Sequence, residues 1–338
     1  MKRITLCCAL LLQLPALSNS HAADTAPAWQ RCTEMQDKAP AQSELDCYRK
    51  LAQAGEAPQK ISLMPQRATG LEQEWTPSNA PLSLYKLNYA LIYARSSQPN
   101  NAPTSPNPLN QMAASQLDDR DMKFQFSIKH DLADFERYGS LWLAYSQLSF
   151  WQVYDQTNSR PFRENNYEPE LIYSIRPNDL FGNHPLTPGI VNFGFVHQSN
   201  GQAKPRSRSW NRLYVQAGIE RSYSGERRFI ALLRAWRKIN EDPIADDNAD
   251  ITDYQGHGDL ELRYSQNRFW EASLILKPRS VQLDLAAPWS AWRLLTLAAP
   301  GAHNTNIHLQ YFSGYGESLI DYNQRHDTWG VGLSFPFE

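Results

Sequence analysis

A histidine and a serine stand two positions apart at the end of an alternating apolar segment, residues 191–201. In a strand, one face of this segment would carry Val191, Phe193, Phe195, His197 and Ser199. A serine hydroxyl is a weak nucleophile until a base removes its proton, and an imidazole can be that base near neutral pH. The pair therefore predicts attack of Ser199 on an ester carbonyl, giving an acyl-enzyme that water later releases.

An asparagine on the next predicted strand supplies a third member of this group. Asn211 shares a face with the apolar Leu213, and a hairpin through the loop 200–209 would bring Asn211 beside His197. Its side-chain oxygen can accept the second ring N–H of His197 and fix the tautomer, although it lacks the charge of an aspartate. Gln147, at a like position on an earlier strand, is expected to orient Asn211 from behind.

Chance also produces His-x-Ser pairs, and a histidine at a strand end is more often an interfacial residue. Three features favour the catalytic interpretation. The pair lies on an apolar row, where an unsatisfied polar group would cost several kcal/mol in lipid. Asn211 lies on the neighbouring strand, and the sequence has no Gly-x-Ser-x-Gly nucleophile motif elsewhere.

The elements that would position these residues show a period of two from Leu82 onward, which is typical of strands with one apolar and one polar face. Segment 227–238 alternates poorly, and segment 280–296 is long and contains Pro288. The twelve predicted strands are 82–95, 121–130, 139–152, 166–175, 190–199, 209–219, 227–238, 258–266, 268–277, 280–296, 304–314 and 327–337.

Export and strand length favour a membrane barrel over a soluble β-sandwich. Lys2 and Arg3, an apolar stretch at 4–17 and small residues around Ala22 predict a signal peptide. No later stretch approaches the roughly 18 apolar residues of a spanning helix, whereas strands of about ten residues cross a bilayer when tilted. The last strand is amphipathic with aromatic residues almost to position 338, as in outer-membrane proteins. The predicted fold is all-β: a twelve-stranded antiparallel transmembrane β-barrel in the outer membrane of a Gram-negative bacterium.

Three regions follow from these patterns: a signal peptide at 1–22, a periplasmic N-terminal extension at 23–81, and the barrel with the site on its outer wall at 82–338. Cys32 and Cys47 remain after cleavage, and an oxidising compartment favours a disulfide between them, although their pairing stays open. The net charge of -2 gives no basic excess for a nucleic-acid partner.

Several longer motifs occur in order along the chain. They are Tyr145-Ser146-Gln147, Pro161-Phe162-Arg163-Glu164 with Asn166-Tyr167-Glu168-Pro169, Gly194-x-x-His197-x-Ser199-Asn200-Gly201, and Ser313-Gly314-Tyr315-Gly316-Glu317-Ser318 with Asp321-Tyr322-Asn323. From about Leu82 to its end, the chain thereby resembles the outer membrane phospholipase A family. The resemblance implies a twelve-stranded barrel that hydrolyses phospholipid and lysophospholipid acyl esters at either glycerol position. It also implies dependence on Ca²⁺ and activation as a homodimer at the outer leaflet.

The resemblance assigns roles position by position. It implies Ser199 as nucleophile, His197 as base and Asn211 as the orienting residue, with Gln147 behind Asn211.

For calcium, the resemblance implies ligation by the hydroxyls of Ser207 and Ser159 and the carbonyl of Gln202, with Ser159 supplied by the partner subunit. Calcium prefers such oxygen ligands and can stabilise an oxyanion. Two positions depart from the family pattern: Ser146 stands where threonine is common, and Gln202 stands where an arginine is expected. The loss of that cation could alter the affinity for a phosphate.

Two other interpretations stay open on sequence alone. The acidic stretch 242–253 could bind a divalent cation, but such a run is more often a solvated extracellular loop. The barrel could also be a diffusion channel or a structural barrel without hydrolase activity, or an acylhydrolase acting on lipopolysaccharide. A barrel of twelve strands is narrower than the sixteen-stranded porins, which favours a filled interior.

Overall fold

Alternating apolar and polar residues form the walls of the structure, as the period of two predicts. All described residues belong to one compact unit, residues 62–338. The expected signal peptide and the two cysteines of the expected extension lie outside the described residues. The computed structural model describes residues 70–77, 82–178, 188–223, 227–242, 244–266, 270–288 and 305–335.

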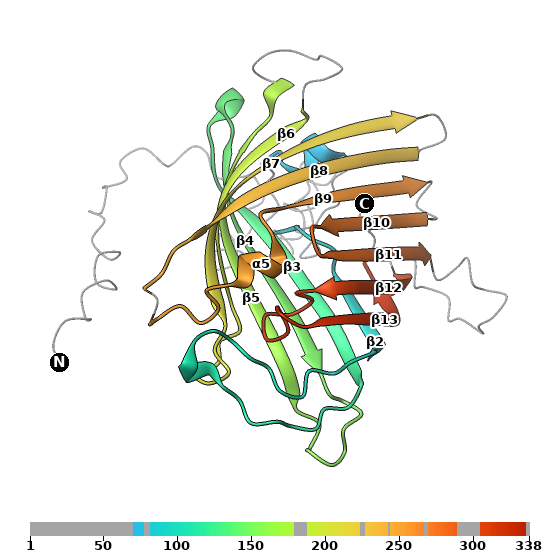
Figure 1. The fold of residues 1–338 in the computed structure, drawn as a ribbon. Helices are drawn as coiled ribbons and strands as arrows, with labels where there is room; N and C mark the ends of the chain where they lie inside the picture. The colour runs from blue at the N-terminus through green and yellow to red at the C-terminus, as the bar shows by residue number, and fades with distance from the viewer. Residues whose placement is uncertain are drawn as a thin grey trace, which may run out of the picture. The chain divides into compact units, whose positions relative to one another are not determined.

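The strands form one antiparallel sheet that closes on itself (Figure 1). Strand β13 pairs with β2, and β3 joins β2 to β4, so strands β2 to β13 complete the barrel. The two-residue β1 (Ser83–Leu84) pairs with β3 and continues the line of β2. The predicted twelve-stranded antiparallel barrel is confirmed. Its strands are β2 (Tyr89–Ser96), β3 (Arg120–Asp134), β4 (Ser140–Trp151), β5 (Phe162–Ile175), β6 (Ile190–Ser199), β7 (Ser209–Tyr223), β8 (Arg227–Ile239), β9 (Gly258–Gln266), β10 (Trp270–Lys277), β11 (Ser280–Pro288), β12 (Asn306–Tyr315) and β13 (Arg325–Ser334).

The structure describes the two irregular segments of the sequence to different extents. Strand β8 alternates poorly because its inward side chains are apolar too: Leu232 is buried in the barrel while Leu233 is exposed on the outside. Strand β11 is described from Ser280 to Pro288, and residues 289–296 of the predicted strand 280–296 lie outside the described residues.

In the part of the chain that the structure describes, helical structure is confined to short pieces. They are α3 (Leu71–Glu74), α5 (Ile251–Gln255) and the 3-10 turns η1 (Pro108–Asn110) and η2 (Glu136–Tyr138). Among the described residues, no helix is long and apolar enough to cross a membrane.

The outer face of the barrel is an apolar surface. On β6 and β7, the outward side chains of Phe193, Phe195, Leu213 and Val215 are between 42% and 56% exposed. Contiguous apolar surface of this extent on a closed barrel is typical of a wall that meets lipid.

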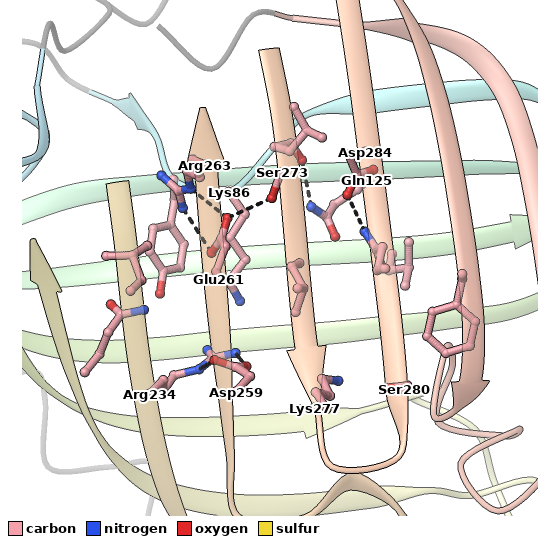
Figure 2. A pocket seen from close by; sticks show the side chains of 18 of the residues that line it. Lys86, Gln125, Arg234, Asp259, Glu261, Arg263, Ser273, Lys277, Ser280 and Asp284 are labelled. Carbon is pink, nitrogen blue, oxygen red and sulfur yellow. Dashed lines mark hydrogen bonds and ion pairs between the residues drawn. The ribbon is translucent and has the colours of Figure 1, made fainter. Parts of the chain in front are cut away.

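The interior of the barrel is polar, and many of its charges are paired. Lys86 contacts both Glu168 and Glu170, and Arg234 forms an ion pair of 2.6 Å with Asp259. Figure 2 shows Arg234 and Asp259 beside a cavity inside the barrel. The volume of this cavity is about 210 Å³. Paired charges across the lumen favour a filled interior over a conducting channel, because each pair blocks part of the path.

Helix α3 and the residue after it, within the region expected as a periplasmic extension, place two apolar side chains inside the barrel. Leu71 and Trp75 are buried, and the Leu71 N–H donates to Glu220 on β7 at 2.6 Å. The Nζ of Lys129 lies 3.7 Å from the ring centroid of Trp75, 5.0 Å from that of Trp142, and 3.7 Å from a Glu74 carboxylate oxygen. An aromatic cage with one carboxylate therefore stabilises a buried ammonium group.

Replacing Trp75 by leucine is expected to lower the free energy of unfolding by about 2 kcal/mol. Leucine keeps an apolar side chain, but it removes the ring face that stabilises the desolvated Lys129 ammonium. Urea unfolding of the barrel in lipid vesicles measures the loss. Trp75→Phe retains a ring and should lose less, and equal losses in the two variants would argue against the cage.

Candidate active site

Strands β6 and β7 form the hairpin that positions the candidate residues. In its register His197 pairs with Asn211, and Ser199 pairs with Ser209. His197 and Ser199 end the outward row that contains the exposed Phe195. The apolar row and the hairpin, both read from sequence, are thus present in the structure, and they bring His197, Ser199 and Asn211 to one end of the outer wall.

The imidazole of His197 is held by the amide of Asn211. Its Nδ1 lies 2.8 Å from the side-chain oxygen of Asn211. Because that oxygen can only accept, Nδ1 carries the hydrogen, and Nε2 has the free lone pair. The geometry therefore sets the tautomer in which Nε2 can act as a base toward Ser199, two residues further along the same face.

A carboxylate that sequence reasoning missed lies behind Asn211. The Asn211 Nδ2 donates to Glu241 Oε1 at 2.9 Å. In the β7–β8 register Asn211 pairs with Ile239, so Glu241 follows two residues beyond on the same outward face. Extending the weakly alternating segment 227–238 by three residues would have placed Glu241 there.

Gln147, expected behind Asn211, lies elsewhere. Its amide accepts from Tyr145 at 3.0 Å and donates to Ser149 at 3.0 Å, all within β4. Strands β5 and β6 separate β4 from β7 in the sheet, so the prediction that Gln147 orients Asn211 is corrected: Glu241 occupies that position.

The loop after Ser199 turns at a glycine and is anchored from inside the barrel. Gly201 has a φ of 64°, and a Cβ there would lie 3.0 Å from the ring of Tyr167. The side-chain oxygen of the buried Asn200 accepts from the Arg208 N–H at 3.0 Å, which joins the two ends of the loop. A side chain at Gly201 would be strained both by conformation and by contact.

Oxygen atoms gather around Ser207 in the same loop. Its hydroxyl donates to one carboxylate oxygen of Asp247, and the other oxygen of that carboxylate accepts from the Asn110 amide at 3.0 Å. The side-chain oxygen of Asn110 is buried and has no hydrogen-bonding partner in the described part of the chain. Gln202 is exposed in this loop, and Ser159 lies in the turn between β4 and β5 with a φ of 61°.

The middle of the acidic stretch is buried, whereas its composition favoured a solvated loop. Asp246, Asp247 and Asn248 are buried, and Asp246 forms an ion pair of 2.7 Å with Lys238. Asp250 accepts from the Tyr322 hydroxyl at 2.6 Å, and burial together with this hydrogen bond raises the pKa of Tyr322. The stretch is a packed support for the loop 200–208. No cluster of three or more histidine, cysteine, aspartate or glutamate side chains suited to a metal occurs among the residues the structure describes.

A closed, lipid-facing barrel with a serine, a histidine and an amide on its outer wall defines an integral membrane barrel with a candidate hydrolytic site. Comparison with known proteins gives the family. The model of the family described as phospholipase A1 matches residues 66–335, and the chain belongs to this family.

Relatives and solved structures agree with this membership. A putative phospholipase A1 of Neisseria meningitidis is 35% identical over 247 residues, which span 70% of this chain and 60% of that protein. The phospholipase A1 of Escherichia coli strain K12 is 32% identical over 251 residues, 74% of this chain and 79% of the relative. The crystal structure of the Salmonella typhi outer membrane phospholipase dimer with bound calcium superposes with a TM-score of 0.64 at 27% identity, covering 80% of this chain and 98% of that one. The outer membrane phospholipase A of Escherichia coli gives a TM-score of 0.61 at 29% identity, covering 75% and 98%.

Proposed function

We propose that this protein hydrolyses the acyl ester bonds of phospholipids as a calcium-dependent phospholipase A1/A2, also acting on lysophospholipids. Ser199 is the nucleophile, His197 the base and Asn211 the residue that orients the imidazole. The observation that carries the proposal is the hydrogen bond between His197 and Asn211, which prepares Nε2 as a base beside Ser199 on the lipid-facing wall. A solved active-site mutant of the Escherichia coli relative, in which an asparagine is replaced by alanine, supports a role for an asparagine.

The chemistry follows from the arrangement of these three side chains. The Ser199 Oγ attacks the ester carbonyl carbon while its proton passes to His197 Nε2. The imidazolium returns this proton to the departing glycerol oxygen, which leaves an acyl group on Ser199. Water then attacks the acyl carbonyl with His197 again as base, and the fatty acid departs.

Loop lengths support a location of the site at the outer leaflet. The two longest connections between the described strands, 97–119 and 240–257, lie at the same end of the barrel as Ser199. Outer-membrane barrels carry their longer loops outside the cell and their short turns in the periplasm. Phospholipid would then reach Ser199 sideways from the membrane, along the apolar row of Phe193 and Phe195.

The oxygen cluster around Ser207 fits a calcium ion. Since the Ser207 hydroxyl directs its hydrogen to Asp247, its lone pairs are available. The Asn110 oxygen, which has no partner among the described residues, lies in the same cluster. The Ser207 hydroxyl and the Gln202 carbonyl would hold the ion, together with Ser159 from a second copy in a homodimer. Bound there, calcium would stabilise negative charge on the ester oxygen.

Removing calcium is expected to lower fatty-acid release from micellar phospholipid by about 100-fold or more, the loss seen when an oxyanion stabiliser is removed. The assay compares the purified, refolded protein with added calcium and with a chelator. Recovery on adding back calcium completes the expected result. Equal rates in both conditions would remove calcium from the proposal, while conductance across a bilayer without any hydrolysis would favour the channel.

A further inference from the structure

We propose that Glu241 is a positioning residue of the hydrolytic site, acting by fixing the orientation of the Asn211 amide. This inference rests on the proposed roles of Ser199, His197 and Asn211. It extends the group to a chain of four side chains: serine, histidine, asparagine and glutamate.

An asparagine in this place has a difficulty that an aspartate lacks. The two ends of its amide differ: the oxygen accepts hydrogen bonds and the nitrogen donates them. If the amide turned over, the NH₂ group of Asn211 would face His197 Nδ1, which would then have to be the acceptor. The proton of the neutral ring would move to Nε2, and His197 could no longer take a proton from Ser199.

The carboxylate of Glu241 removes this ambiguity. An ionised carboxylate only accepts, so the end of the amide that faces Glu241 must be Nδ2, at 2.9 Å. The oxygen of Asn211 is therefore left to face His197 Nδ1, at 2.8 Å. Glu241 also places one negative charge at the end of the chain, which favours the imidazolium that forms when Ser199 loses its proton.

The fold holds Glu241 where this role requires it. Ile239, which pairs with Asn211 across the β7–β8 ladder, is outward-facing and 38% exposed. Glu241 lies one strand period beyond, diagonal to Asn211, within reach of a side-chain contact. The side chain of Glu241 is half-buried, so the contact is shielded in part from water.

The test compares Glu241→Gln in two backgrounds, the natural chain and Asn211→Asp. In the natural chain, kcat is expected to fall about 10- to 100-fold with KM unchanged, as for loss of a hydrogen bond to a charged group. In the Asn211→Asp background, Glu241→Gln is expected to have the opposite effect on kcat. Both ends of an aspartate carboxylate accept, so it cannot turn over into a wrong orientation, and it repels the carboxylate of Glu241. Glu241→Gln is therefore expected to raise kcat about tenfold in this background. Asp242→Asn, which removes one negative charge at the next residue, is the matched control and should leave kcat unchanged in both backgrounds.

A second readout separates this inference from the proposed function. The rate at which a fluorophosphonate labels Ser199, followed by mass spectrometry, reports the base without phospholipid turnover. Failure to label Ser199 in the natural chain would refute the proposed nucleophile. Two outcomes would overturn the role of Glu241 and leave the proposed nucleophile standing. In the first, Glu241→Gln does not change the rate at which Ser199 is labelled. In the second, Glu241→Gln causes the same loss of kcat in both backgrounds.

Discussion

Replacing Ser199 by alanine is expected to lower phospholipid hydrolysis by about four orders of magnitude or more while the barrel stays folded. Removal of the nucleophile in a serine hydrolase costs as much as removal of the whole catalytic group, because its members act together. The Ser199 side chain is small and partly exposed at the end of β6, so its loss leaves the pairing of β6 with β7 intact.

The measurement is fatty-acid release from micelles in calcium, alongside circular dichroism to verify the barrel. Ser209→Ala is the matched control, since Ser209 pairs with Ser199 in the ladder but has no part in the proposed chemistry. Turnover by a folded Ser199→Ala protein at the rate of the Ser209→Ala control would refute the proposed nucleophile.

The sequence was sufficient to predict the strands and the face on which His197, Ser199 and Asn211 lie. Strand periodicity is local, and a hairpin register follows from two neighbouring strands. Strand β6 begins and ends where alternation predicts, at residues 190 and 199. The pairing of His197 with Asn211 follows from the loop between them.

The contacts that the sequence did not predict join parts of the chain far apart in sequence. Asp247 is buried because Ser207 and Asn110 pack against it, and neither neighbour can be inferred from an acidic run. The contact between Trp75 and Lys129 inside the barrel likewise joins residues far apart in the sequence, so neither residue's neighbours predict it. Gln147 was placed by analogy of position on a strand, and the strand order of the sheet puts Glu241 at Asn211 instead.

Replacing Glu317 by alanine is expected to destabilise the barrel by about 3–5 kcal/mol, because it leaves a buried ammonium group without its counter-charge. Glu317 lies between β12 and β13 and forms an ion pair of 2.7 Å with Lys123 on β3. Its other oxygen accepts from His326 and from Thr328, each at 2.8 Å. The side chains of Lys123 and Glu317 are 1% and 3% exposed, so water cannot replace the lost carboxylate at little cost.

An exposed ion pair gives the contrast. Arg95 and Asp119 lie 2.7 Å apart, but their side chains are 54% and 35% exposed. Asp119→Ala should therefore cost less than about 1 kcal/mol. Urea unfolding in lipid vesicles compares the free energies of unfolding of the two variants. Similar losses of free energy would show that burial does not make the Lys123–Glu317 pair more stabilising than the exposed pair.

The pH dependence of stability gives a second measure of the same pair. Burial alone would raise the pKa of Glu317, but Lys123 and His326 hold this pKa well below its ordinary value. A group whose pKa is lower in the folded state stabilises fully above its unfolded pKa, about 4.3 for glutamate, and that stability is lost as the pH falls toward the folded value. Relative to its value at about pH 5, the gap in unfolding free energy between the natural chain and Glu317→Ala should therefore narrow below about pH 4. A gap that stays the same down to strongly acidic pH would mean that the side chain stabilises by packing and not by charge.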